Sequence, residues 1–143
     1  MMKKVFLDTN ILIDYLARRG QFFEPAAQIV QLGSAHMNSA CLYLPCRLPR
    51  QVSYWRHITS CQKEAIVHKF AEFVTMCNVT PVDSFIVDEA IASRFFDFED
   101  AMQYYSAVRE GADAIITRNS SDFNDAEIEV YEPQQFLDML AKE

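Results

Sequence analysis

A short apolar run that ends on a carboxylate constrains the fold of this chain more than any other stretch. Val5-Phe6-Leu7 is followed by Asp8, and apolar residues then recur at helical spacing from Ile11 to Leu16. This order predicts a strand, a turn and a helix, with Asp8 at the carboxyl end of the strand. Open α/β sheets bind ligands at that end, and an unpaired buried carboxylate is costly. We therefore expect Asp8 to meet a cation or hydrogen-bond donors.

The rest of the chain alternates predicted strands and helices. Strands are predicted at residues 35–44, 78–82, 114–117 and 128–131, and helices at residues 24–32, 62–76, 84–95, 99–110 and 133–140. Residues 45–60 are left unassigned, because prolines at 45 and 49 disfavour a helix interior and a central strand. The alternation predicts one domain over residues 1–143, folded as a three-layer α/β/α sandwich with a central parallel sheet.

Composition and charge narrow the class of protein. No apolar run approaches the roughly 20 residues that span a bilayer, and the stretch before Asp8 is too short for a signal peptide, so we expect no membrane partner and a cytoplasmic location. The net charge of -7 argues against a protein that holds nucleic acid by broad electrostatic attraction. It is compatible with a metal-dependent nuclease, because a bound cation offsets clustered carboxylates.

Three polar clusters lie where predicted strands end or predicted helices begin. They are Asp8-Thr9-Asn10, Asp97 with Glu99 and Asp100, and Thr117 with Asn119 and Asp122. Neighbouring parallel strands bring their carboxyl ends to one edge, so we expect the clusters to meet there. Carboxylate, hydroxyl and amide oxygens suit Mg²⁺ or Mn²⁺, which bind one or two carboxylates directly and keep several waters.

Each cluster also has a purely structural interpretation. Asp8-Thr9-Asn10 and Asp97 could each cap the helix that follows, and residues 119–122 could form only a turn. Glu99 and Asp100 suit the positive first turn of a helix in any protein. The joint placement of the clusters favours a site over these alternatives. Asp14, by contrast, is expected on the solvated side of its helix with a structural role.

Three segments resemble the signature segments of PIN domains, the ribonuclease domains of VapC-type toxins in bacterial toxin–antitoxin pairs. They read VFLDTN at residues 5–10, DFEDAMQ at 97–103 and ITRNSSDF at 116–123. The resemblance covers about residues 3–32 and 62–140. It implies the α/β/α fold, hydrolysis of RNA by a water activated by Mg²⁺ or Mn²⁺, an antitoxin protein as partner, and a homodimer. Carried over by position, it implies Asp8, Asp100 and Asp122 as catalytic metal ligands, supported by Thr9, Asn10, Asp97, Glu99, Thr117 and Asn119.

Residues 38–61 depart from this resemblance. The family has a further acidic or amide residue at about positions 40–50, whereas this chain has no Asp or Glu between Pro25 and Lys63. We interpret the segment as replaced, for example by compensating frameshifts, and resequencing the locus tests this hypothesis. Asn38 or Ser39 could supply a neutral oxygen in its place.

The missing acid leaves alternatives open for the function. One is a weak or inactive PIN-like domain that binds RNA or a protein without cutting. Another is a phosphatase of the haloacid dehalogenase type, which also uses an aspartate at the end of its first strand. That class has a second aspartate two positions later, where this chain has Asn10.

Overall fold

The computed structural model describes residues 3–33, 40–45, 63–95 and 97–143. Its strands are β1 (Lys3–Leu7), β2 (Ala40–Pro45), β3 (Cys77–Thr80), β4 (Ala114–Ile116) and β5 (Glu129–Tyr131). Its helices are α1 (Thr9–Leu16), α2 (Gly20–Leu32), α4 (Lys63–Phe73), α5 (Ser84–Ile91), α6 (Phe98–Arg109), the 3₁₀ helix η1 (Ser120–Phe123) and α7 (Pro133–Ala141). None of the helices in these ranges is long and apolar enough to cross a membrane.

The strands form one sheet in the order β3-β2-β1-β4-β5, and every neighbouring pair is parallel. β1 lies in the middle, where Val5 is in register with Ala114 of β4. Because the strands are parallel, the residues that follow β1, β4 and β5 all lie at one edge of the sheet. Asp8, Thr117 and Glu132 are those residues. The predicted parallel sheet is therefore confirmed.

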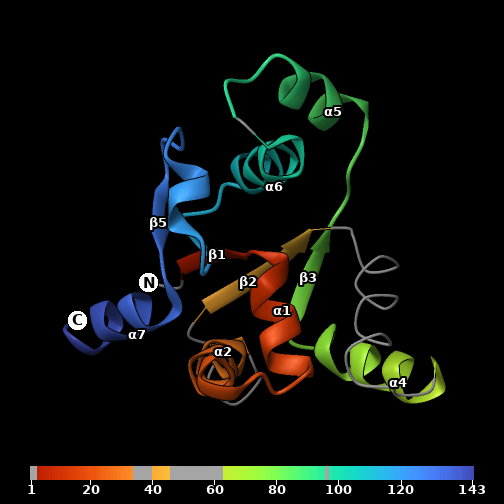
Figure 1. The fold of residues 1–143 in the computed structure, drawn as a ribbon, viewed down its shortest axis with the longest axis vertical. Helices are drawn as coiled ribbons and strands as arrows, with labels where there is room; N and C mark the ends of the chain where they lie inside the picture. Colours follow the sequence, from red (N-terminus) through yellow and green to blue (C-terminus); the bar gives the residue numbers. More distant parts are fainter. Residues whose placement is uncertain (1–2, 34–39, 46–62, 96) are drawn as a thin grey trace.

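Alternating side chains of β1 enter two different cores. Val5 and Leu7 pack with apolar residues of α1, α2, α4 and α7, whereas Phe6 packs with α6 and η1. All three side chains are fully buried, and each contributes about 1.5–3 kcal/mol through the removal of apolar surface from water. Figure 1 shows α5 and α6 on one side of the sheet and α1, α2 and α4 on the other. This is the predicted α/β/α sandwich.

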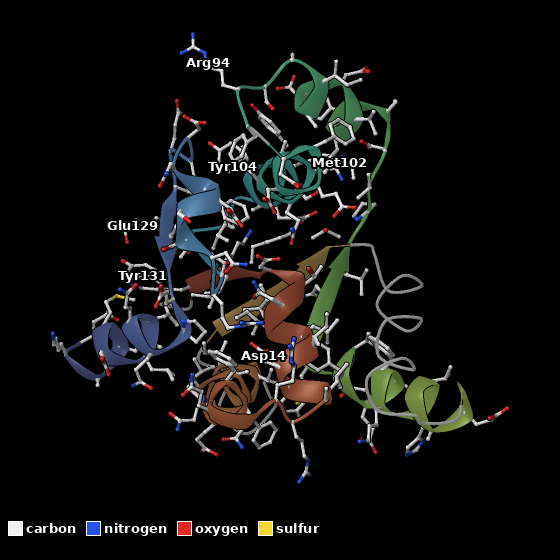
Figure 2. The ribbon with its side chains drawn as sticks, viewed as in Figure 1. Asp14, Arg94, Met102, Tyr104, Glu129 and Tyr131 are labelled. Carbon is white, nitrogen blue, oxygen red and sulfur yellow. The ribbon has the colours of Figure 1, made fainter. Side chains whose placement is uncertain are left out.

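Tyr104 joins the second core to the far end of the sheet. Its ring lies 4.9 Å from that of Phe95, measured between centroids, and it belongs to the same core cluster as the buried Phe123 of η1. Its hydroxyl accepts a hydrogen bond from the N–H of Glu127 at 3.2 Å. Figure 2 shows the side chain reaching from α6 toward the segment between η1 and β5. This hydrogen bond joins α6 to the segment between η1 and β5.

The start of α2 differs from the sequence prediction. The helix begins at Gly20, four residues earlier than predicted, so Pro25 lies inside it and not in its first turn. Gly20 has φ of +47°, a conformation that glycine adopts without the strain of a Cβ. Pro25 removes one intrahelical hydrogen bond, and the full burial of Ile29 and Val30 in the next turn offsets that loss.

Two other element ends also differ from expectation. α5 ends at Ile91 and not at the predicted residue 95, and its N-cap is Asp83, whose carboxylate accepts the N–H of Ile86 at 3.2 Å. Pro45 ends β2, a strand with neighbours on both sides, although proline there was taken to disfavour a central strand. The register with β1 runs only to Tyr43, so at Pro45 the strand pairs with β3 alone. Most of the atypical segment at residues 38–61, including Asn38 and Ser39, lies outside the described residues.

Candidate active site

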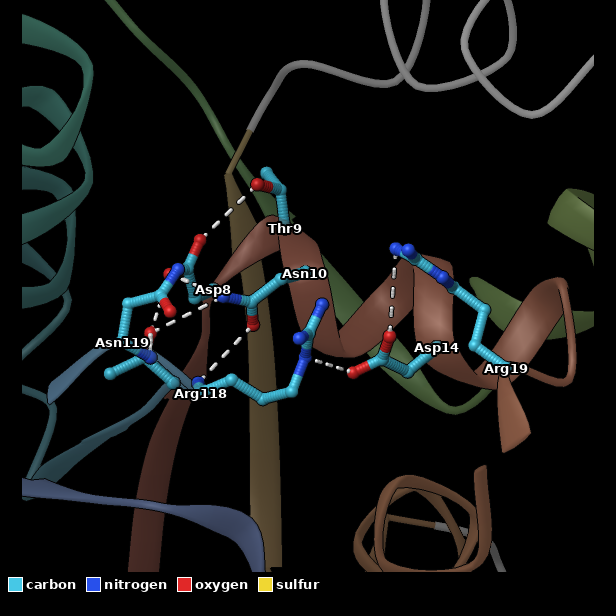
Figure 3. Close-up of polar contacts among 8 residues, drawn as sticks. Asp8, Thr9, Asn10, Asp14, Arg19, Arg118 and Asn119 are labelled. Carbon is cyan, nitrogen blue, oxygen red and sulfur yellow. Dashed lines mark hydrogen bonds and ion pairs between the residues drawn. The ribbon is translucent and has the colours of Figure 1, made fainter. Parts of the chain in front are cut away.

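Asp8 follows β1 directly and is only 6% exposed. Its Oδ2 accepts hydrogen bonds from the hydroxyl of Thr117 at 2.7 Å and from the side-chain amide of Asn10 at 3.3 Å. Its Oδ1 accepts one from the hydroxyl of Thr9 at 3.2 Å (Figure 3). Asp8 occupies the N-cap position of α1, yet its side chain makes no cap hydrogen bond. The capping interpretation therefore does not describe the side chain of Asp8, which accepts hydrogen bonds from three neutral donors.

The turn after β4 is tied to the start of α1 through the same network. Thr117 is fully buried, and its hydroxyl oxygen accepts hydrogen bonds from the N–H of Asn119 at 3.0 Å and from the amide of Asn10 at 3.5 Å. The N–H of Arg118 donates to Oδ1 of Asn10, also at 3.5 Å. These contacts fix where Thr117 places its donor, and hence how Asp8 is oriented.

Asp100 brings a second carboxylate to this region from the first turn of α6. Asp97 is the N-cap of that helix, since its Oδ1 accepts the N–H groups of Glu99 at 2.8 Å and Asp100 at 3.0 Å. Burial and, to a smaller extent, the charges of Asp97, Asp8, Asp122 and Glu99 together raise the pKa of Asp100 to about 7. Asp97 thus performs the capping role, and Asp100 stands among like charges.

Asp122 is the most exposed of the three carboxylates that the sequence singles out. It lies in η1, where its N–H donates to the carbonyl oxygen of Asn119 at 3.0 Å. Its charge acts on Asp100, which places the two carboxylates in the same electrostatic neighbourhood. Within the described ranges, no three Asp, Glu, His or Cys side chains are grouped closely enough to hold a metal ion together.

The donor set nevertheless fits a hard cation. Asp8 offers carboxylate oxygens whose donors are all neutral. Burial and the neighbouring acidic charges together raise the pKa of Asp100, and a cation would offset both the burial cost of its charge and the repulsion. Oxygen ligands of this kind suit Mg²⁺ or Mn²⁺ and not the softer metals.

Comparison with known protein families decides the family of this chain. The PIN domain matches residues 4–121, a span that includes the segment that departs from the resemblance. This chain belongs to the PIN domain family. The resemblance predicted from the three segments is therefore confirmed.

Relatives of this PIN domain agree with the fold. It is 26% identical over 141 residues to Ribonuclease VapC1 of Aquifex aeolicus (strain VF5), an alignment that covers 95% of this chain and 94% of the relative. VapBC2 from Rickettsia felis, solved with a promoter DNA fragment, superposes with a TM-score of 0.65 at 14% identity, over 90% of this chain and 98% of that one. A toxin-antitoxin complex from Klebsiella pneumoniae superposes with a TM-score of 0.59 at 20% identity, over 90% of this chain and 97% of that one. PAE2754 from Pyrobaculum aerophilum superposes with a TM-score of 0.62 at 13% identity, over the full length of both chains.

Gln103 is a site residue of the PIN domain that the sequence reasoning missed. Its side chain is 3% exposed, and its Oε1 accepts the backbone N–H of Thr9 at 3.3 Å. This bond joins α6 to the first residue of α1, next to Asp8. A signal was present in the sequence, because Gln103 stands three residues after Asp100 and so shares its helix face.

Asp14 was placed wrongly by the sequence reasoning. It is 1% exposed and not solvated. Its Oδ2 lies 2.6 Å from Nε of Arg118, and its Oδ1 lies 4.0 Å from Nη1 of Arg19 (Figure 3). Burial raises the pKa of Asp14, and the two guanidiniums lower it in part. The structural role predicted for Asp14 therefore takes the form of a buried ion pair that holds the turn after β4 against α1.

Proposed function

We propose that this PIN domain is a divalent-metal-dependent endoribonuclease and the toxin of a toxin–antitoxin pair. The observation that carries the proposal is the buried Asp8 at the carboxyl edge of the sheet, close enough to Asp100 for its charge, like that of Asp122, to act there, while burial and these charges together raise the pKa of Asp100 to about 7. The relative from Aquifex aeolicus, which is named a ribonuclease, supports the same chemistry.

Mg²⁺ or Mn²⁺ would be held by Asp8 and Asp100, with Asp122 beside them. When bound, such a cation supplies an activated water and stabilises charge on the phosphoryl oxygens. The residues of the chain do the positioning. Thr117 and Asn10 fix Oδ2 of Asp8, and Thr9 fixes Oδ1.

The partners follow from the relatives. Some of the similar solved structures carry names of toxin–antitoxin complexes, and those names describe those proteins. We extend them to this chain as a proposal: RNA is its substrate, and an antitoxin protein binds it. A homodimer and a cytoplasmic location stay predictions.

A domain that binds RNA or a partner without cutting is the second candidate. It is favoured by the span from Pro25 to Lys63, in which no acidic residue occurs. The match to the PIN domain gives no support to the phosphatase alternative.

The test is cleavage of labelled RNA by the purified protein in Mn²⁺, with and without a chelator. Asp100→Asn is expected to slow cleavage about 100-fold, because it removes a ligand of the cation. Asp113→Asn is the matched control: Asp113 is exposed at the opposite edge, where Oδ2 accepts the N–H of Lys4 at 2.8 Å. Equal cleavage by all three proteins, or cleavage that ignores the chelator, overturns the proposal. Binding of RNA without cleavage supports the second candidate.

A further inference from the structure

A cavity of about 410 Å³ opens beside the acidic edge of the sheet. Its lining includes Phe22 of α2, Arg118, and Glu132 with Pro133 at the junction of β5 and α7. Arg118 follows β4 and Glu132 follows β5, so the cavity lies outside the carboxyl ends of these two strands. That is the edge at which Asp8 lies, and the volume is within the roughly 300–1,000 Å³ of small-ligand pockets.

Two other cavities lie elsewhere. One of about 170 Å³ lies between α1 and α4 and is lined by Tyr15 and Phe73. One of about 470 Å³ includes Asp113 and Ala114, where β4 begins. Of the three, only the cavity at Arg118 is lined by a covalent neighbour of Thr117. Of the three, it is therefore the cavity that adjoins a residue next to the candidate active site.

The cavity presents flat surfaces that are already in place. Phe22 is 39% exposed, and the guanidinium carbon of Arg118 lies 4.3 Å from the centre of its ring. The guanidinium is held by the ion pair with the buried Asp14 at 2.6 Å. Aromatic rings and guanidinium planes are the groups on which proteins stack unpaired nucleobases.

The charges around the cavity favour a base over a phosphate. Arg118 shares its charge with Asp14, and the carboxylate of Glu132 adds negative charge to the lining. A phosphate would meet a poorly compensated environment there, whereas a neutral base would not. The backbone N–H of Arg118 donates a hydrogen bond to Asn10, and the side-chain amide of Asn10 donates one to Asp8. An RNA chain with a phosphate at Asp8 would therefore have this cavity next to it.

We propose that the cavity at Phe22 and Arg118 is a subsite for a nucleobase of single-stranded RNA, next to the phosphodiester that is cut. The inference rests on the proposed ribonuclease function and adds to it the place where the substrate is recognised. Phe22 is a binding residue in this account and takes no part in the bond cleavage.

The test compares Phe22→Ala with Phe85→Ala, because Phe85 is also exposed but lies on α5, beyond β3 at the other side of the sheet. Binding of labelled RNA is measured by fluorescence anisotropy in Ca²⁺, and cleavage is measured in Mn²⁺. Phe22→Ala is expected to raise Kd and KM about 5- to 100-fold, as the loss of one stacked base predicts. Phe22→Trp and Phe85→Ala should stay close to the wild type. Hydrolysis of bis(p-nitrophenyl) phosphate, which has no base, should not change.

The outcomes separate the subsite from the proposed function. If the wild type cuts RNA and Phe22→Ala binds and cuts it equally well, the proposal of the subsite is wrong and the proposal of a ribonuclease is retained. If the wild type binds RNA without cutting and Phe22→Ala weakens binding, the subsite stands and the ribonuclease fails. Equal loss on RNA and on the small phosphodiester overturns the subsite, because the change then acts on the acidic edge. A wild type that neither binds nor cuts RNA overturns both.

Discussion

Asp8 and Asp14 are six residues apart and almost equally buried, at 6% and 1% exposure, yet they have different kinds of partner. Asp8 receives hydrogen bonds from two hydroxyls and an amide. Asp14 instead faces the guanidiniums of Arg118 and Arg19. Neutral donors satisfy the lone pairs of a carboxylate but leave its charge in place, whereas a guanidinium cancels it. In our proposal the first carboxylate binds a cation, whereas the second holds two segments together.

Asp100 extends the comparison to a third carboxylate. Its neighbours are acids, and burial together with their charges raises its pKa to about 7. Asp8 is oriented by hydrogen-bond donors, whereas Asp100 is repelled by the charges of neighbouring acids. A cation between these regions would use the orientation of the first and relieve the repulsion at the second.

The largest expected effect tests the difference between Asp8 and Asp14 directly. Asp8→Asn should lower RNA cleavage in Mn²⁺ about 10³-fold, because the cation loses its best-oriented ligand. Asp14→Asn, the same change six residues later, should leave the cleavage by folded protein within about fivefold. Circular dichroism before each assay confirms that the variants are folded. A thousandfold loss in both variants would remove the distinction between the two carboxylates.

Arg118→Met should lower the free energy of unfolding by about 2–3 kcal/mol at pH 7.5, because it leaves a buried carboxylate without its main cation. Without the guanidinium, burial raises the pKa of Asp14 further above its ordinary value of 3.8. The folded variant then takes up a proton more readily than the unfolded chain. Its stability is consequently retained at low pH and lost as pH rises through the raised pKa.

Urea unfolding at pH 5.0 and pH 7.5 measures this effect. The difference between Arg118→Met and the wild type should be larger at pH 7.5. The double variant Asp14→Asn/Arg118→Met should regain part of the stability and lose the extra dependence on pH. A deficit of the same size at both pH values argues that lost packing on Phe22, and not the ion pair, is responsible.

Thr117→Val should lower kcat about 10-fold, which corresponds to about 1.4 kcal/mol, because it removes the hydroxyl that donates to Asp8 at 2.7 Å. Thr117→Ser keeps the hydroxyl and should retain most of the activity. Both rates are measured with saturating RNA and Mn²⁺. Equal rates for the valine and serine variants would show that the hydroxyl does not orient Asp8.

The smallest expected effect is that of Asp100→Asn on stability, and it should be favourable. The raised pKa of Asp100 means that its charge destabilises the folded state increasingly as pH rises from about 4 to about 7. After allowance for solvent screening, the variant should be about 1 kcal/mol more stable than the metal-free wild type at pH 7.5, with little difference at pH 4. In thermal-shift measurements, Mn²⁺ should raise the Tm of the wild type more than that of the variant. An unchanged or lower Tm for the metal-free variant contradicts this account.

Local pattern was enough to predict much of the fold and the outline of the site. The apolar run of β1 and the helical spacing of α1 are features of neighbouring residues, and the structure agrees at both elements. The contact between Asp8 and Thr117 was also within reach, because parallel strands bring residues after β1 and β4 to one edge. The roles of Asp8, Asp100 and Asp122 as metal ligands stay predictions.

The contacts that the sequence did not reveal depend on side-chain direction across long separations. Asp14 was expected in solvent because its partner, Arg118, lies on a different element and no local pattern links them. Gln103 was missed because its partner is the backbone N–H of Thr9, and a backbone group is the same whichever residue type stands there. The early start of α2 was missed because burial in the next turn outweighs the preference of Pro25 for a first turn.

The hydrogen bond between Thr117 and Asp8 joins residues 109 positions apart, and β1 is completed in the sheet by β4, which is made late. During synthesis β1 therefore cannot pair with β4 until more than three quarters of the chain exists. A chain that stops before β4 contains Asp8 but neither Thr117 nor Asp122. Truncated products that end before β4 therefore have no assembled site, whatever acidic residues they contain.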